Sequence, residues 1–271
     1  MIALFILIVV FIIVASQIDI ERESMTAGSK RSVVVDKTVV INLDRDKRRY
    51  KNVKKRCRKA EIRFDRYSAI DGRNLDLHQL ESKGLLKLSP YSFFNHNSGG
   101  RDSLKGSIGC ALTHRQIWRE LADSLHQTCL ILEDDVEIPS DFWKRFNEIE
   151  IPNDWDIVFL GGVRIYGKPV HNNLIRAVST KSNYWNNCGL YAYLINKRSA
   201  KRLLDMVDTV QTYLDIQMNR FYNKLKVYYI VPNIVKHDFS VKSSRSTGSS
   251  HKKGYFYSKS FIDRSKSVIT I

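Results

Sequence analysis

The chain has 271 residues, of which 43% are hydrophobic and 11% aromatic. A chain of this length and composition can bury one sizeable core, whereas two full domains would be cramped. The formal net charge of +16 favours polyanionic surroundings such as nucleic acid, anionic lipid or phosphorylated ligands. Because the basic residues are spread through the sequence, we interpret most of them as solvated surface and not as one dedicated binding patch.

The N-terminus predicts a membrane-directed segment over residues 1–18. Ile2 to Ala15 is an unbroken run of Ile, Leu, Val, Phe and Ala. The segment lies at the lower limit of the roughly 17 to 25 residues that a spanning helix needs, so we expect a single-pass anchor. A cleaved signal is the alternative, although no Lys or Arg precedes the apolar run. The expected location is a Golgi or endoplasmic reticulum membrane in a eukaryote, or the cell envelope in a bacterium.

Composition divides the rest of the chain into three parts. Residues 19–36 are polar and low in aromatics, which predicts a stalk. Residues 37–240 carry the patterned segments of a folded domain. Residues 241–271 are basic and rich in Ser, and we interpret them as a tail.

The folded domain is predicted to open with Thr38–Leu43, a β-branched run typical of a buried strand, followed by a basic helix over 46–59. A second strand is predicted at 63–68. Ala69–Gly72 ends it with a turn, since Asp-Gly favours left-handed backbone conformations. Residues 90–101 have no periodicity and predict a loop.

Beyond this loop, Gly106–Gly109 leads into a predicted helix whose apolar residues recur near one face. Alternating strands and helices follow, with strands at 128–132, 156–160, 190–195 and 226–231, and helices from Pro139 and over 198–206 and 213–222. This alternation predicts an α/β fold with a mostly parallel central sheet. Ligands in such folds bind beyond the carboxyl ends of the strands.

Glu133-Asp134-Asp135 follows one of these strands and is the first candidate for chemistry. Adjacent carboxylates repel one another, so a positive group should lie beside them. In an extended backbone Glu133 and Asp135 would share a face while Asp134 points away, so two carboxylates could bind one divalent cation. Oxygen ligands suit Mg²⁺ or Mn²⁺. The alternative is a solvated acidic turn.

Two further residues are candidates for the same site. His237 follows the last predicted strand in a polar segment and could be a third metal ligand, although a lone His is more often structural. Asp215 lies at the start of a predicted helix, where the helix dipole favours a carboxylate, so a capping role is its alternative. The cysteines, Cys57, Cys110, Cys129 and Cys188, match no zinc or thioredoxin pattern and leave open up to two disulfides or buried thiols.

In order and spacing, several segments resemble glycosyltransferase family 25, which includes lipopolysaccharide galactosyltransferases of bacteria and collagen galactosyltransferases of animals. These segments are Ile41–Arg45 (INLDR), Ala69–Gly72 (AIDG), Gly106–His114 (GSIGCALTH), Leu132–Asp135 (LEDD) and Gly189–Ile195 (GLYAYLI), with Asp215 downstream. The resemblance covers about residues 38–246. Thr113 replaces a Ser of the family pattern, and Leu214 stands where a Pro is common.

The resemblance implies a GT-A-like, Rossmann-related single domain behind an N-terminal transmembrane segment. It also implies a UDP-sugar donor, usually UDP-galactose, and inversion at the anomeric carbon. Mn²⁺ or Mg²⁺ on Glu133, Asp135 and His237 would neutralise the diphosphate leaving group as a Lewis acid. Asp215 would be the base that deprotonates the acceptor hydroxyl. The implied donor-binding residues are Asn42, Leu43, Arg45, Asp71, His114 and Asp134.

The expected partners are therefore a nucleotide-sugar donor, a glycan, lipid-linked or protein acceptor, and a membrane. Two other functions remain open. A catalytically inactive relative could serve as an adhesion or scaffold protein. A metal-dependent nuclease would fit the charge and the carboxylates, but no nucleic-acid module is recognisable, so no nucleic acid is expected.

Overall fold

A computed structural model describes residues 33–88, 100–179, 185–240 and 269–270, with side chains from Leu104 onward in the second range. The chain divides into a unit of residues 1–33 and a unit of residues 34–271. The fold described below belongs to the second unit. The predicted anchor at 1–18, the predicted stalk up to residue 32, nearly all of the predicted loop at 90–101 and nearly all of the predicted tail lie outside the described residues.

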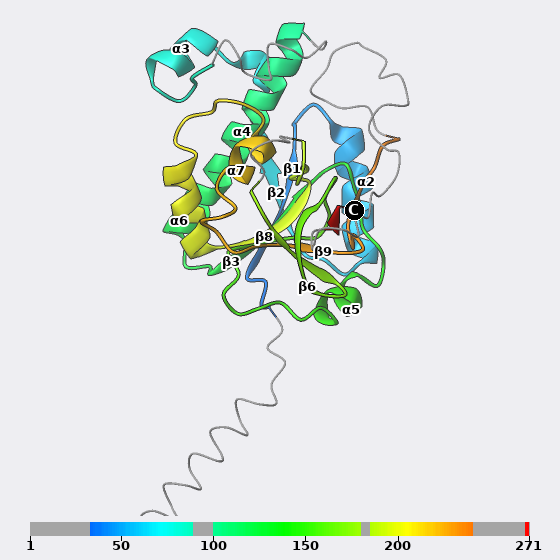
Figure 1. Cartoon of the computed structure of the whole chain (residues 1–271). Helices are drawn as coiled ribbons and strands as arrows, with labels where there is room; N and C mark the ends of the chain where they lie inside the picture. Colours follow the sequence, from blue (N-terminus) through cyan, green and yellow to red (C-terminus); the bar gives the residue numbers. More distant parts are fainter. Residues whose placement is uncertain (1–32, 89–99, 180–184, 241–268, 271) are drawn as a thin grey trace, which may run out of the picture. The chain divides into compact units, whose positions relative to one another are not determined.

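A mixed nine-stranded sheet forms the centre of the second unit (Figure 1), in the order β11-β6-β7-β9-β5-β8-β3-β1-β2. Its strands are β1 (Lys37–Asn42), β2 (Asp65–Ser68), β3 (Thr128–Glu133), β5 (Ile157–Phe159), β6 (Tyr166–His171), β7 (Leu174–Ala177), β8 (Ala192–Asn196), β9 (Val227–Ile230) and β11 (Ile269–Thr270). A separate two-stranded sheet pairs β4 (Val136–Glu137) with β10 (Lys236–His237).

Strand direction follows the predicted parallel pattern in one part of the sheet and departs from it in another. β1 pairs in parallel with β2 and β3, and β5 pairs in parallel with β9. β8 is antiparallel to both β3 and β5, so β3 and β5 run in the same direction on either side of it. The hairpin β6–β7 adds antiparallel strands beyond β9. The α/β class is confirmed, and the sheet is mixed.

Helices cover both faces of this sheet, with α4 and α6 on one side and α2 on the other (Figure 1). They are α2 (Lys47–Lys59), α3 (Leu77–Ser82), α4 (Gly100–Asp123), α5 (Phe142–Asn147), α6 (Lys197–Met206) and α7 (Leu214–Asn219), with a short 3-10 helix at Gly72–Asn74. Val39 and Ile41 belong to the core cluster that includes Trp118 of α4. Val40 between them is equally buried, because alternate strand residues face opposite sides.

The predicted elements coincide closely with several observed ones, including the first strand, the basic helix after it and the strand before the acidic trio. Helix α4 differs, because it begins at Gly100 and contains Gly106 and Gly109, which were expected to precede it. A close backbone contact explains the glycines. A Cβ on Gly109 would lie 2.6 Å from the carbonyl oxygen of Ile70, and one on Gly72 would lie 2.1 Å from that of Lys105. Glycine therefore lets the Ala69–Gly72 turn rest directly on α4.

Asp36, the residue just before β1, is hydrogen-bonded to the folded domain. The Asp36 carboxylate accepts hydrogen bonds from the backbone N–H groups of Gln127 (2.7 Å) and Thr128 (3.0 Å). Asp36 therefore fixes the start of β1 to the start of its parallel neighbour β3. In the part of the chain that the structure describes, no helix has the length and apolar character needed to span a bilayer.

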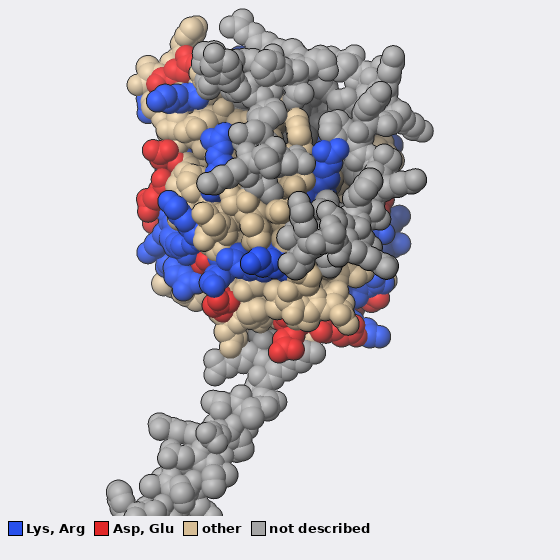
Figure 2. Space-filling view, viewed as in Figure 1, with Lys and Arg blue, Asp and Glu red and all other residues tan. Residues whose placement is uncertain are grey.

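Basic side chains on the face seen in Figure 2 lie in several separate groups, with acidic side chains among them. Helix α6 contains four basic residues, Lys197, Arg198, Lys201 and Arg202. The Arg198 and Arg202 guanidinium groups both pair with the buried Asp156 at 3.0 Å. Part of the positive charge is therefore used inside the fold, to fix α6 to the start of β5.

Candidate active site

The acidic trio lies at the carboxyl end of β3. Glu133 is the last residue of that strand, and Asp134 and Asp135 form a turn before β4. The backbone is therefore not extended through the trio, and the alternation expected for Glu133 and Asp135 does not apply. The consequence is that Glu133 contacts different residues from Asp134 and Asp135, which share Arg49.

Asp134 is buried between the first strand and helix α2. Its Oδ2 accepts a hydrogen bond of 2.6 Å from the Nδ2 of Asn42, the last residue of β1. The guanidinium of Arg49 forms ion pairs with Asp134 and, at 2.6 Å, with Asp135. Because β1 and β3 are parallel neighbours, their carboxyl ends bring Asn42 and the trio together.

Burial and neighbouring charges shift the pKa values of Asp134 and Arg49 in opposite directions. Burial raises the pKa of Asp134 to about 6, although Arg49 and the Asn42 hydrogen bond favour its ionised form. Burial alone would lower the pKa of Arg49, but the charges of Asp135, Asp134 and Glu133 outweigh it and raise that pKa. Arg49 is thus the positive group that the clustered carboxylates require.

Asp135 and His237 form a second contact at the same edge. The Asp135 Oδ2 lies 3.4 Å from the His237 Nε2, and the Asp135 backbone oxygen accepts a hydrogen bond of 2.7 Å from the Asp238 N–H. Strand pairing explains the contact, because His237 of β10 lies opposite Val136 of β4. The structure thus brings together two of the residues that the sequence predicts as metal ligands.

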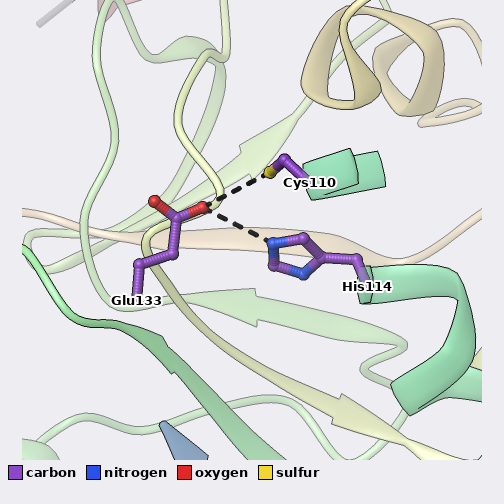
Figure 3. Close-up of side chains that lie close together, drawn as sticks. All are labelled: Cys110, His114 and Glu133. Atoms are coloured by element: carbon purple, nitrogen blue, oxygen red, sulfur yellow. Dashed lines mark hydrogen bonds and ion pairs between the residues drawn. The ribbon is translucent and has the colours of Figure 1, made fainter. Parts of the chain in front are cut away.

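Glu133 turns toward helix α4. Its Oε1 lies 3.5 Å from the Nε2 of His114 and 3.9 Å from the Sγ of Cys110, while its other carboxylate oxygen points away from both side chains (Figure 3). Cys110 and His114 are four residues apart and so lie on one face of α4. His114 is fully buried.

A hydrogen-bond chain in the core holds the His114 ring. Its Nδ1 lies 2.8 Å from the Tyr193 hydroxyl, which accepts a hydrogen bond of 2.9 Å from the Trp118 indole N–H. Tyr193 is on β8, the antiparallel neighbour of β3. This arrangement directs the other ring nitrogen, Nε2, toward Glu133.

The remaining predicted donor residues lie near the ends of β1 and β2. Leu43 follows β1, and its carbonyl oxygen accepts a hydrogen bond of 2.9 Å from the Asp46 N–H. Asp71 pairs with Arg45 and, at 2.8 Å, with Arg73. The Arg73 hydrogen bonds, helped by Arg45, hold the pKa of the Asp71 carboxyl well below its usual range. Arg45 and Asp71, which the resemblance places together at the donor site, are therefore a preformed ion pair.

Asp215 is near the start of α7, as predicted, and is half-buried. Its Oδ2 accepts a hydrogen bond of 3.0 Å from the Gly189 N–H, and its Oδ1 accepts one of 2.9 Å from the Ile216 N–H. Two residues beyond Gly189, the Tyr191 carbonyl oxygen accepts a hydrogen bond of 2.8 Å from the Glu133 N–H. The short segment 189–191 therefore links Asp215 to the end of β3.

The donor atoms near the trio suit a divalent ion. Asp135 and His237 present a carboxylate oxygen and an imidazole nitrogen at 3.4 Å, a separation that two ligands of one ion can adopt. The contacts place Glu133 with the α4 pair instead, so the complete set of Glu133, Asp135 and His237 stays a prediction. Sequence reasoning did not predict the role of Cys110 and Tyr193 beside His114, although the helical spacing of Cys110 and His114 was available as a signal.

Comparison with known proteins supports the resemblance. Residues 35–218 match the family described as "Glycosyltransferase family 25 (LPS biosynthesis protein)". Procollagen galactosyltransferase 1 of Danio rerio is 30% identical over 177 residues, which cover 62% of this chain and 28% of that protein. A Bos taurus protein described as "Probable inactive glycosyltransferase 25 family member 3" is 28% identical over 180 residues, which also cover 62% and 28%.

The chain thus spans less than a third of the length of these curated relatives. Among solved structures, the galactosyltransferase LgtC in complex with donor and acceptor sugar analogues matches with a TM-score of 0.37 and 13% identity, over 71% of this chain and 72% of that one. This TM-score is too low to assign the fold from the likeness. The family match covers well over half of the chain and includes the ends of β1 and β3 and Asp215. The chain belongs to glycosyltransferase family 25.

Proposed function

We propose that this protein transfers a hexose, with galactose as the first candidate, from a UDP-sugar to a hydroxyl group of a glycan, lipid-linked or protein acceptor. The observation that carries the proposal is the junction at the carboxyl ends of β1 and β3. There Asn42 donates a hydrogen bond to Asp134, and Arg49 pairs with both Asp134 and Asp135. His237 lies beside Asp135. The junction lies almost wholly within the residues that match the family. We also propose that the fold is GT-A-like.

Neutralising the diphosphate is the first task of such a site. Asp135 and His237, with Glu133 as the third predicted ligand, would hold Mn²⁺ or Mg²⁺, which supplies the positive charge that a diphosphate leaving group needs. Arg49 pairs with Asp134 and Asp135 and so keeps positive charge at the edge where the diphosphate would lie.

Binding of the nucleotide is proposed for the neighbouring edge of the sheet. Asn42, Leu43, Arg45 and Asp71 lie at or just beyond the ends of β1 and β2. The Arg45–Asp71 pair is already formed, which reduces the cost of ordering these side chains when the donor binds. His114 lies behind Glu133 and would act by positioning that carboxylate.

Asp215 is the proposed base. In an inverting transfer, the acceptor oxygen forms a bond to the anomeric carbon while the bond from that carbon to the diphosphate oxygen breaks. The hydroxyl proton passes to the Asp215 carboxylate, and the nucleoside diphosphate leaves with the bonding electron pair. Hydrogen bonds from Gly189 and Ile216 fix the orientation of this carboxylate.

We also propose a membrane anchor at 1–18, a stalk at 19–36 and a basic tail at 241–271. They would place the enzyme on a Golgi or endoplasmic reticulum membrane in a eukaryote, or on the cell-envelope membrane in a bacterium. No nucleic acid is expected as a partner, in keeping with the separate basic groups on the visible face (Figure 2).

A catalytically inactive relative is the second candidate function. One similar protein is itself described as probably inactive, and Asp215 makes two backbone hydrogen bonds that a purely structural aspartate would also make. Such a protein would keep the fold of the domain and would bind another macromolecule without turning over a donor.

Donor binding by the full 271-residue chain separates the two candidates. Calorimetric titration with UDP-, GDP- and CMP-sugars, each with Mn²⁺, Mg²⁺ or a chelator, should show binding of one UDP-hexose that the chelator weakens. Hydrolysis of the same donor would then establish turnover. If the chain is folded by circular dichroism and binds none of these donors, the inactive relative is the better description.

A further inference from the structure

The cluster of Cys110, His114 and Glu133 brings together a thiol and an imidazole that the proposed donor site does not use as metal ligands. One ligand atom from each side chain lies within 4.8 Å of the others. They come from two elements, the helix α4 and the end of β3, and they converge on one point (Figure 3). A thiol, an imidazole and a carboxylate together are the donor types that bind zinc.

The unsatisfied ring nitrogen of His114 is independent evidence for a ligand at this cluster. Its ring is fully buried, and its Nε2 has no hydrogen-bond partner among the described residues. The nearest carboxylate oxygen, on Glu133, is 3.5 Å away, which exceeds the roughly 2.7 to 3.2 Å of a hydrogen bond. Buried polar nitrogens are normally satisfied, so this atom is directed at a position that another group should occupy.

The contacts behind the ring match those of a metal-binding histidine. Such a histidine uses its second nitrogen for a hydrogen bond that fixes the ring and its tautomer. Here the Nδ1 lies 2.8 Å from the Tyr193 hydroxyl, whose oxygen already accepts from Trp118. A bound ion would select the tautomer in which Nδ1 donates to Tyr193 and the lone pair of Nε2 faces Cys110 and Glu133.

The distances fit a tetrahedral ion. Zinc bonds of about 2.3 Å to sulfur and about 2.0 to 2.2 Å to nitrogen or oxygen separate neighbouring ligand atoms by about 3.4 to 3.6 Å. The observed separations are 3.5 Å from Oε1 to Nε2 and 3.9 Å from Oε1 to Sγ. The third pair, the Cys110 Sγ and the His114 Nε2, lies within 4.8 Å, so the half-buried Cys110 side chain would move toward the ring to complete the site.

From this geometry we propose that Cys110, His114 and Glu133 form a binding site for Zn²⁺ or a similar thiophilic divalent ion. Glu133 then serves this ion and is not the third ligand beside Asp135 and His237. The Cys110 thiol loses its proton to solvent on binding, because the thiolate is the ligand. Three protein ligands leave a fourth position for water or another small ligand. The ion links α4 to β3, so its binding stabilises the folded chain.

Cobalt is the probe that tests this site, because Co²⁺ takes the same ligands and absorbs light. The reduced full-length chain is titrated with Co²⁺ in the absence of any donor sugar. We expect a near-ultraviolet thiolate-to-cobalt band and visible bands of four-coordinate strength, which saturate at one Co²⁺ per chain whether or not further Co²⁺ binds at Asp135 and His237. Zn²⁺ should abolish these bands at one equivalent, and Mn²⁺ at the same concentration should not.

Variants assign the bands to this cluster. Cys110→Ser should remove the thiolate band, and Cys188→Ser, at another half-buried cysteine, should leave it unchanged. Tyr193→Phe should weaken Co²⁺ binding by about 10- to 100-fold, as expected for loss of a supporting hydrogen bond. A wild-type chain without the band, or a band that survives in Cys110→Ser, overturns the proposal.

Folding is checked separately so that the result stays interpretable. If Cys110→Ser is unfolded by circular dichroism, Glu133→Gln takes its place, since the Glu133 side chain is 25% exposed. That variant should weaken Co²⁺ binding by at least about 10-fold, whereas unchanged affinity contradicts the site. Because no donor is present, failure of this proposal is distinguishable from failure of the proposed glycosyl transfer.

Discussion

The Asn42 side-chain amide donates a hydrogen bond of 2.6 Å to the Asp134 carboxylate, and this bond joins the ends of two neighbouring parallel strands. Asn42 is 2% exposed and Asp134 is 6% exposed. The Asn42 Oδ1 in turn accepts from the Arg66 guanidinium at 2.9 and 3.0 Å. One amide therefore satisfies a buried carboxylate and a cation from β2.

Replacing Asn42 should destabilise the domain. In Asn42→Ala the buried Asp134 loses a charge-assisted hydrogen bond, and we expect the free energy of unfolding to fall by about 1.5 to 3 kcal/mol. Urea denaturation followed by tryptophan fluorescence measures the change. Asp44→Ala is the matched control, because Asp44 also contacts Arg66 but its side chain is 72% exposed. An equal loss in the control would show that Arg66, and not Asp134, accounts for the effect.

Asp215→Asn tests the assignment of the base. The amide can keep a hydrogen bond from Gly189 or Ile216 but cannot take the acceptor proton, so kcat should fall by about 10²- to 10⁴-fold. Donor affinity, measured by calorimetry, should stay unchanged. Steady-state transfer to a suitable acceptor, or donor hydrolysis if none is found, provides the rate.

Asp205→Asn is the control for that variant, since Asp205 is an exposed aspartate on the neighbouring α6. It should have the activity of the wild-type chain. A loss of stability in Asp215→Asn without any change in kcat would assign Asp215 a structural role at the start of α7.

The ends of β1 and β3 were predictable because their motifs are local. A β-branched run that ends in Asn42 and an apolar run that ends in Glu133 are each typical of a buried strand. Neighbouring parallel strands bring such ends together, so the sequence predicts one edge of the sheet as the site. The direction of each carboxylate was not predictable, because the turn at Asp134 and Asp135 replaces the strand alternation.

Other features depend on contacts that no local pattern encodes. Strand β8 is apolar like its neighbours, and only its pairing with β3 and β5 shows that it is antiparallel. The hairpin β6–β7 was missed because Tyr166–His171 contains Gly167 and Pro169, which disfavour strands. Arg49 could be suggested as a phosphate partner from its position, but its ion pairs with Asp134 and Asp135 required the fold.

Asp156 offers a test of the fold away from the site. Its carboxylate, 1% exposed, accepts from Arg198, Arg202, Ser199 and the Lys226 N–H. Asp156→Asn leaves these donors around a neutral amide. We therefore expect the free energy of unfolding at pH 7 to fall by about 3 kcal/mol. Thermal and urea unfolding would measure this loss, and a loss below about 1 kcal/mol, closer to that of a surface substitution, would contradict the assigned role.

The pKa of Asp156 also predicts how the stability of the chain changes with pH. Although burial acts to raise it, the pKa of Asp156 is lowered in the folded chain by the hydrogen bonds from Ser199 and Lys226 and by the nearby arginines. Its stabilising contribution is therefore complete above the ordinary aspartate pKa and is lost as the pH falls below about 4. Wild-type stability should fall more steeply than that of Asp156→Asn on acidification from pH 4, and equal slopes would exclude this contribution.

The most direct test of metal-assisted transfer is turnover of UDP-galactose by the full chain, measured with Mn²⁺ and with a chelator. The Asp135→Asn and His237→Ala variants are compared with Glu137→Gln. Glu137 is an exposed carboxylate on β4, next to the site but outside the proposed ligand set. We predict Mn²⁺-dependent turnover in the wild-type and Glu137→Gln chains and a loss of about 100-fold or more in the other two, since a metal ligand contributes several kcal/mol to the transition state. Full turnover in Asp135→Asn and His237→Ala would exclude metal-assisted transfer at Asp135 and His237.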